Sequence, residues 1–193
     1  MENLTFTLQV ITVDFFLAYG LYSLLYLACR IFITNPILEK IDVESTKLIS
    51  LIGIVYGVLW LIGLGIILTS SAEQDLYDVK NRIFGKYWFG YWIQPFLWIL
   101  ITQLLRFIKI RRNILSRLTA AFFLMLSIER IIIIITSLHR DYLPSSWTMY
   151  SDAGIYPSNF FLGMLMKVFL FLFFVASYYY LKIFSKKNKI LNN

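Results

Sequence analysis

Five long apolar stretches divide the chain, and polar segments separate them. The stretches cover about Phe6–Ile33, Lys47–Thr69, Tyr87–Ile110, Ile114–Leu138 and Asn159–Phe184. Each is long enough for a helix that crosses a bilayer core, which needs roughly 20 residues. None shows the strict alternation of a lipid-facing β-strand, and the helix is the other element that satisfies its own backbone in lipid. The pattern predicts one all-α integral membrane domain over residues 1–193, with about five transmembrane helices, four in a bundle plus one.

The positions of Lys and Arg predict the orientation of this domain. One side collects Arg30, Lys40, Lys47, Arg106, Lys109, Arg111, Arg112, Arg117, Lys182, Lys186, Lys187 and Lys189. The other side has Lys80, Arg82, Lys86 and Arg140 among several carboxylates. Because cytoplasmic loops carry an excess of basic residues, we expect the N-terminus outside and the C-terminus in the cytoplasm. The start of the chain has no basic n-region, so the first stretch is expected to be retained rather than cleaved.

Composition narrows the function classes. Hydrophobic residues make up 59% of the chain and charged residues 15%, which is typical of a protein dissolved in lipid rather than water. The net charge of +7 does not indicate nucleic acid, because the basic residues flank apolar spans. A single cysteine, Cys29, and a single histidine, His139, exclude an iron–sulfur cluster and a bis-histidine haem held within this chain. We expect no cofactor bound by this chain alone, and any redox cofactor would have to be a diffusible quinone or sit in a partner.

Two adjacent charges, Glu129 and Arg130, lie inside the fourth apolar stretch. A charge at the centre of a membrane helix costs roughly 2.5–3.5 kcal/mol on insertion scales. Neighbours on a helix point about 100° apart, so each charge needs a partner on another helix. Candidate partners are Asp14, Lys167, Gln9 and Gln103. The pair is expected to belong to an intramembrane charge network that fixes the helix register, to be a remnant of a proton path, or to reach headgroups or water.

Two of these candidate partners have alternatives of their own. Lys167 lies a few residues inside the fifth stretch, where a lysine can extend outward to the interface or pair with Glu129. Asp14 lies close to the outer interface, where we expect it to be solvated or to cap its helix rather than to catalyse.

Aromatic residues and the last long loop supply the remaining candidate sites. Tyr87, Trp88, Tyr91 and Trp92 open the third stretch and indicate an interfacial aromatic belt or a face that stacks on a quinone ring. A histidine side chain ordinarily titrates near pH 6.5, so His139 could exchange protons with a quinol. The residues after it suit a loop that docks on a partner: Arg140, Asp141, Tyr142, Leu143, Pro144 and Trp147.

One segment also carries a family resemblance. The charge pair is followed by an apolar run and then by Ser137-Leu138-His139-Arg140-Asp141-Tyr142-Leu143-Pro144-Ser145-Ser146-Trp147. This segment resembles the NrfD-like integral membrane subunits of bacterial respiratory complexes, most of all the type found in alternative complex III. The likeness extends to residues 13–23, to Gly53 and Gly57, to residues 81–92 and to residues 109–113.

The resemblance covers half of the family's architecture. Members have two four-helix bundles, and this chain corresponds to the second bundle and the last helix, without the bundle that holds the family's quinol pocket. Gly63 stands where the family has an intramembrane glutamate, and Ile93-Gln94-Pro95 replaces small polar residues. The resemblance implies a bacterial inner-membrane location, other membrane subunits as partners, and an extracytoplasmic iron–sulfur or multihaem subunit.

These features support three functional hypotheses. The first is an accessory or anchoring membrane subunit of a quinol-linked respiratory electron-transfer complex, without its own cofactor or intrinsic catalysis. The second is a quinone-binding redox subunit that forms its site together with another chain. The third is a scaffold subunit of an unrelated membrane transport or secretion assembly.

Overall fold

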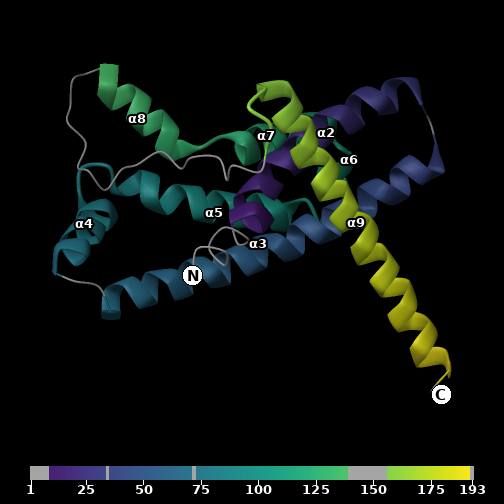
Figure 1. The fold of residues 1–193 in the computed structure, drawn as a ribbon. Helices are drawn as coiled ribbons and strands as arrows, with labels where there is room; N and C mark the ends of the chain where they lie inside the picture. Colours follow the sequence, from purple (N-terminus) through teal and green to yellow (C-terminus); the bar gives the residue numbers. More distant parts are fainter. Residues whose placement is uncertain (1–8, 34, 71–72, 139–155, 192–193) are drawn as a thin grey trace.

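Every element that the structure describes is a helix. The computed structural model describes residues 9–33, 35–70, 73–138 and 156–191, and Figure 1 shows their arrangement. The elements are a π-helical turn η1 (Val10–Asp14), α2 (Phe15–Phe32), α3 (Pro36–Ser70), α4 (Glu73–Phe84), α5 (Trp88–Leu104), α6 (Ile108–Arg112), α7 (Ile114–Met125), α8 (Ile128–Leu138) and α9 (Phe160–Leu191). The predicted all-α fold is confirmed for this part of the chain.

Three of these helices are long and apolar enough to cross a membrane. The candidate spans are Val10–Phe32, Pro36–Ile66 and Phe160–Ser185. The second and third leave most of their apolar side chains exposed, a surface that suits lipid or other membrane helices far better than water. These long apolar helices are compatible with the membrane protein that the sequence predicts. Of the other two predicted stretches, the third becomes the 17-residue helix α5 and the fourth is divided.

The division of the fourth stretch is a departure from the expected continuous helix 114–138. Helix α7 ends at Met125, Leu126 has an extended backbone, and α8 begins at Ile128. Two side chains of α5 bond to backbone groups beside this break. Trp98 Nε1 donates to the Phe123 carbonyl at 3.3 Å, and Gln94 Oε1 accepts from the Ile128 N–H at 2.8 Å. These bonds matter because backbone groups without partners are costly away from water.

A second departure lies between the second and third predicted stretches. The segment expected to be a loop at about residues 70–86 contains the 12-residue helix α4. Helix α4 packs on α5, where Ile83 is buried and its carbonyl accepts a bond of 3.2 Å from Trp92 Nε1. Figure 1 shows α4 at the end of the molecule where α3 finishes and α5 begins.

Small residues allow the helices to approach closely. Gly53 and Gly57, four residues apart on α3, both face α5: a Cβ at Gly53 would collide with Thr102, and one at Gly57 would lie 2.8 Å from Ile99 Cδ1. Gly20 on α2 similarly faces α7. Such spacing of small residues is typical of helix pairs in membranes, where close packing replaces the hydrophobic effect as the source of association.

Aromatic rings fill the centre of the helix assembly. Phe16 of α2 lies 4.9 Å from Trp98 of α5 between ring centroids, and Tyr19 of α2 lies 5.9 Å from Phe171 of α9. All four rings are buried. Helix α9 crosses α2 and α3 here, and its C-terminal part extends away from the other helices (Figure 1). This aromatic core thus holds α2, α5 and α9 together.

Candidate functional site

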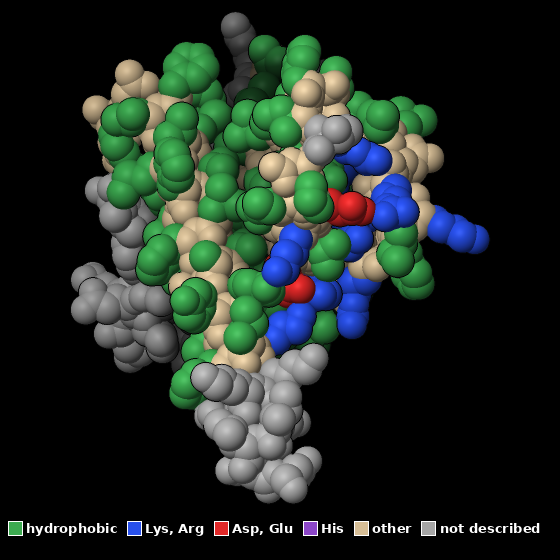
Figure 2. All heavy atoms as spheres, turned by 90° about the vertical axis from the view of Figure 1, so that its right-hand side faces the viewer, with side chains coloured by type: hydrophobic (Ala, Val, Ile, Leu, Met, Phe, Trp, Pro, Cys, Tyr) green, Lys and Arg blue, Asp and Glu red, His purple; other side chains and the backbone are tan. Residues whose placement is uncertain are grey.

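Basic side chains gather at one end of the molecule. Figure 2 looks at this end and shows Lys and Arg around two small groups of Asp and Glu. The described elements that meet here are the end of α2, the start of α3, α6, the start of α7 and the later part of α9. Their basic residues are Arg30, Lys40, Lys47, Lys109, Arg111, Arg112, Arg117 and Lys182. These residues belong to the connections and the tail that the sequence assigned to one side of the membrane.

The centre of this basic end is a buried ion pair between Asp42 of α3 and Arg117 of α7. Their side chains are 4% and 1% exposed. Arg117 Nη1 donates to Asp42 Oδ2 at 3.0 Å and Nη2 donates to Oδ1, the two-pronged geometry that makes such pairs strong and directional. Arg111 Nε lies 3.6 Å from Asp42 Oδ2, and the Arg117 guanidinium lies 4.2 Å from the Tyr26 ring centroid. The pair therefore joins α2, α3, α6 and α7.

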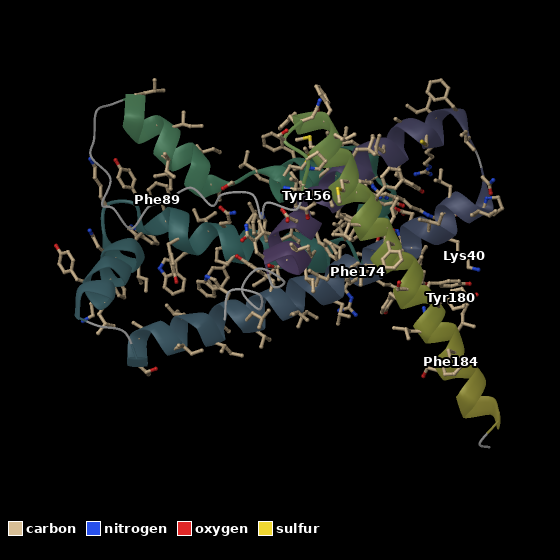
Figure 3. The ribbon with its side chains drawn as sticks, in the orientation of Figure 1. Lys40, Phe89, Tyr156, Phe174, Tyr180 and Phe184 are labelled. Carbon is tan, nitrogen blue, oxygen red and sulfur yellow. The ribbon has the colours of Figure 1, made fainter. Side chains whose placement is uncertain are left out.

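Helix α9 is tied to the same end by two contacts with α3. Lys182 Nζ donates to the Glu44 carboxylate oxygens at 3.1 and 3.2 Å. Lys40 Nζ lies 4.7 Å from the ring centroid of Tyr179, and Figure 3 shows Lys40 beside the segment of α9 that carries Tyr180.

A cavity of about 490 Å³ opens beside the Asp42–Arg117 pair. Its charged lining consists of Arg30, Glu39, Asp42, Arg111, Arg112 and Arg117. Arg112 Nη2 donates to Glu39 Oε1 at 2.7 Å, but both side chains are mostly exposed, at 63% and 56%. Four guanidinium groups and two carboxylates give the lining of this cavity an excess of positive charge.

A second buried ion pair joins α9 to the start of the first span. Lys167 Nζ lies 3.0 Å from Asp14 Oδ1, and both side chains are 8% exposed. Tyr156 donates its hydroxyl to Asp14 Oδ2 at 3.0 Å, and Lys167 Nζ lies 4.6 Å from the Tyr156 ring centroid. Figure 3 labels Tyr156 near the crossing of α9 over α2. Asp14 is thus buried rather than solvated and its side chain does not cap the helix, and the Lys167 ammonium is buried against it.

The structure describes the other predicted site residues only in part. Glu129 and Arg130 lie on α8, and their side chains are outside the part of the chain that the structure describes. The docking loop and His139 lie outside the described residues as well. Gln103, a candidate partner for the charge pair, instead donates from Nε2 to the Ser50 carbonyl at 2.9 Å.

The four aromatic residues predicted to stack on a quinone divide into two environments. Tyr91 and Trp92 pack on Trp60 of α3, with ring centroids 5.7 and 5.5 Å away. Trp88 points outward and is 54% exposed, as expected of an interfacial belt, and Tyr87 lies under the Lys86 ammonium. The structure therefore brings Tyr91 and Trp92 together, but it does not assemble all four residues into one face.

Sequence reasoning missed Asp42 and counted Arg117 only as a loop cation. The reason is that the second helix was expected to begin at Lys47, which left Asp42 in a connection. Asn35-Pro36 is a helix-start signal that could have corrected this, and Asn35 Oδ1 indeed accepts a bond of 2.9 Å from the Ile37 N–H. Starting the helix there places Asp42 and Glu44 on a helix that continues into the membrane span.

Comparisons of the chain with protein-family models, with curated proteins and with solved structures find no match. Within the described residues, no group of three His, Cys, Asp or Glu side chains lies close enough to hold a metal ion.

Proposed function

We propose that this chain is an accessory or anchoring integral membrane subunit of a quinol-linked respiratory electron-transfer complex, without a cofactor of its own. The observation that supports this best is the pairing of buried charges inside the chain. Asp42 is bound by Arg117, and Asp14 is bound by Lys167 and Tyr156. Charges held in this way fix how helices pack, whereas a proton carrier needs a group that can change its protonation state.

The apolar surface also supports an anchoring role. Helix α3 presents exposed large side chains along its membrane part, including Leu51, Val58 and Ile66, and α9 does the same with Phe169 and Phe173. These faces would contact lipid and the other membrane subunits. The basic end would face the cytoplasm, and the loop at 139–158 would dock the extracytoplasmic redox subunit on the opposite side.

A second candidate, a quinone-binding redox subunit, is favoured by one observation. Trp60, Tyr91, Trp92 and Phe96 form a connected group of rings between α3 and α5, and Trp92 and Phe96 are stacked with centroids 6.1 Å apart. Flat rings of this kind can stack on a quinone head. Another chain would have to supply the groups that accept protons.

The experiment that separates the two candidates compares assembly with turnover. Glu129→Gln and Arg130→Met are introduced into the chain in its native membrane, with the exposed Lys109→Met as the matched control. The anchoring role predicts less subunit recovered with its complex, and nearly unchanged specific activity in what assembles. Normal assembly with loss of quinol oxidation for Glu129→Gln would establish the redox role instead.

Co-purification in mild detergent, with a haem spectrum of the pool, tests the complex itself. An iron–sulfur or multihaem partner is expected in the pool. Recovery of a stable complex that contains only transport or secretion proteins would overturn the respiratory assignment in favour of a scaffold in such an assembly.

A further inference from the structure

The cavity at the basic end has an excess of positive charge. It lies where the end of α2, the start of α3 and helix α6 meet, and four arginines and two carboxylates line it. Its volume of about 490 Å³ falls within the range of sites that hold small molecules, roughly 300–1,000 Å³. The surplus of guanidinium groups predicts an anionic ligand.

The donors in this cavity are only partly used by the protein. Asp42 occupies Nη1 and Nη2 of Arg117, yet Arg117 Nε is buried and has no hydrogen-bond partner among the described residues. The Glu39–Arg112 pair is short, at 2.7 Å, but both of its side chains are exposed to solvent. No carboxylate of the described residues forms an ion pair with Arg30. Arg30 is therefore available to an anion that enters the cavity, and Arg112 keeps further N–H donors besides the one that bonds Glu39.

The start of α3 does not supply the anion site. The N–H group of Ile37, in the first turn of α3, donates to the Asn35 side chain and is not open to a ligand. An anion here would therefore be held by arginine side chains. Guanidinium groups match the oxygens of a phosphate, with which they form paired, charge-assisted hydrogen bonds.

The surroundings of the cavity show what kind of phosphate fits. Large apolar side chains next to it are exposed: Ile31, Phe32 and Ile33 at the end of α2, and Ile37 at the start of α3. A soluble phosphate would make no contact with this apolar surface, whereas the acyl chains of a lipid would pack along it. Basic pockets between membrane helices are typical sites for anionic lipid headgroups.

We propose that this cavity binds the phosphate of an anionic membrane lipid, with Arg30 and Arg112 as its main contacts and the lipid chains on the apolar residues of α2 and α3. The site is independent of the respiratory role proposed above, because it requires only that the chain lies in a membrane.

The test measures lipid binding to the purified full chain in detergent by native mass spectrometry. Phosphatidylglycerol and phosphatidylcholine are compared, together with glycerol 3-phosphate as a headgroup without chains. The double variant Arg30→Gln/Arg112→Gln removes the two available arginines. The control Arg106→Gln/Lys109→Gln removes two exposed charges nearby, outside the cavity lining.

Phosphatidylglycerol should bind in preference to phosphatidylcholine, and the cavity variant should lower its affinity about fivefold per arginine. The control should bind like the unmodified chain. Equal binding of the two lipids, or equal losses in both variants, would overturn the proposal. Glycerol 3-phosphate that binds as tightly as the lipid would overturn the assignment to a lipid in favour of a soluble phosphate.

Discussion

The two buried ion pairs contain the same charges and are built differently. In the pair at the basic end, both prongs of a planar guanidinium grip the Asp42 carboxylate, and Arg111 and Tyr26 flank it. In the other pair, the Lys167 ammonium lies 3.0 Å from Asp14 Oδ1, and the Tyr156 hydroxyl donates to Oδ2. Arginine imposes direction on its partner, whereas lysine contacts its partner from many angles. The first pair should therefore fix geometry, and the second should tolerate adjustment.

Both pairs act on the first membrane helix. Asp14 lies at its start, and Tyr26, which packs on Arg117, lies 12 residues further along, about 18 Å at the helical rise. The first pair attaches the end of this helix to α3 and α7, and the second attaches its start to α9. Because a two-pronged guanidinium holds one end and an ammonium holds the other, the helix is expected to pivot more easily at its start.

The largest loss of stability should follow from removing the Asp42–Arg117 ion pair. Arg117→Met leaves the Asp42 carboxylate buried without its main partner and should lower the free energy of unfolding by about 3–5 kcal/mol. Unfolding in mixed detergent micelles, followed by circular dichroism, measures this. The double variant Arg117→Met/Asp42→Asn should recover part of the loss, because no charge is then left uncompensated. A loss below about 1 kcal/mol in the single variant would contradict the enclosed geometry.

Lys167→Met should cost less than Arg117→Met, about 1.5–3 kcal/mol in the same assay. The reason is that Asp14 keeps its hydrogen bond from Tyr156 when the ammonium is removed. Lys167→Arg should preserve more stability than Arg117→Lys does, because a lysine cannot reproduce the two-pronged bond to Asp42. Equal losses for these two exchanges would show that the pairs do not differ in rigidity.

The two ion pairs show which features of the molecule could be predicted from its sequence. Long apolar runs and the cost of charges in lipid were enough to predict helices and to name Asp14 and Lys167 as candidate partners of Glu129 and Arg130. The pairing of Asp14 with Lys167 could not be predicted, because it depends on α9 crossing the start of the first span, a contact between residues more than 150 positions apart. Pair geometry depends on packing that no local pattern encodes.

The broken fourth stretch shows a second limit. The stretch is apolar apart from Arg117, Glu129, Arg130 and a few hydroxyl residues, and it has no Gly or Pro that would mark Leu126 and Ser127 as a break. The bonds that Trp98 and Gln94 make to the backbone on either side of it come from a neighbouring helix. The Asp42–Arg117 pair was missed for a different reason. The helix-start signal at Asn35-Pro36 was present, but the helix was expected to begin where the apolar stretch begins, at Lys47.

Tyr156→Phe is a smaller change beside the Asp14–Lys167 pair. It removes one hydrogen bond to Asp14 Oδ2 and keeps the aromatic ring beside Lys167. The free energy of unfolding should fall by about 1.5 kcal/mol, the lower end for a hydrogen bond to a charged group, because the Lys167 ammonium remains beside Asp14. Tyr179→Phe, whose ring lies near Lys40, is the matched control and should change stability less. A loss as large as that of Lys167→Met would mean that the phenol, not the ammonium, is the main partner of Asp14.

The smallest effect is expected at Glu39 and Arg112, which form a short but exposed ion pair. A double-mutant cycle with Glu39→Gln and Arg112→Gln should give a coupling of roughly 0.2–1 kcal/mol, because water competes for both groups. Raising the salt concentration should reduce this coupling further, since exposed charges are screened. The same cycle on Asp42 and Arg117 should give a larger coupling that changes little with salt, because those side chains are buried. A salt-insensitive coupling at Glu39 would mean that this part of the cavity is covered when the chain lies in its membrane, as a bound lipid headgroup would cover it.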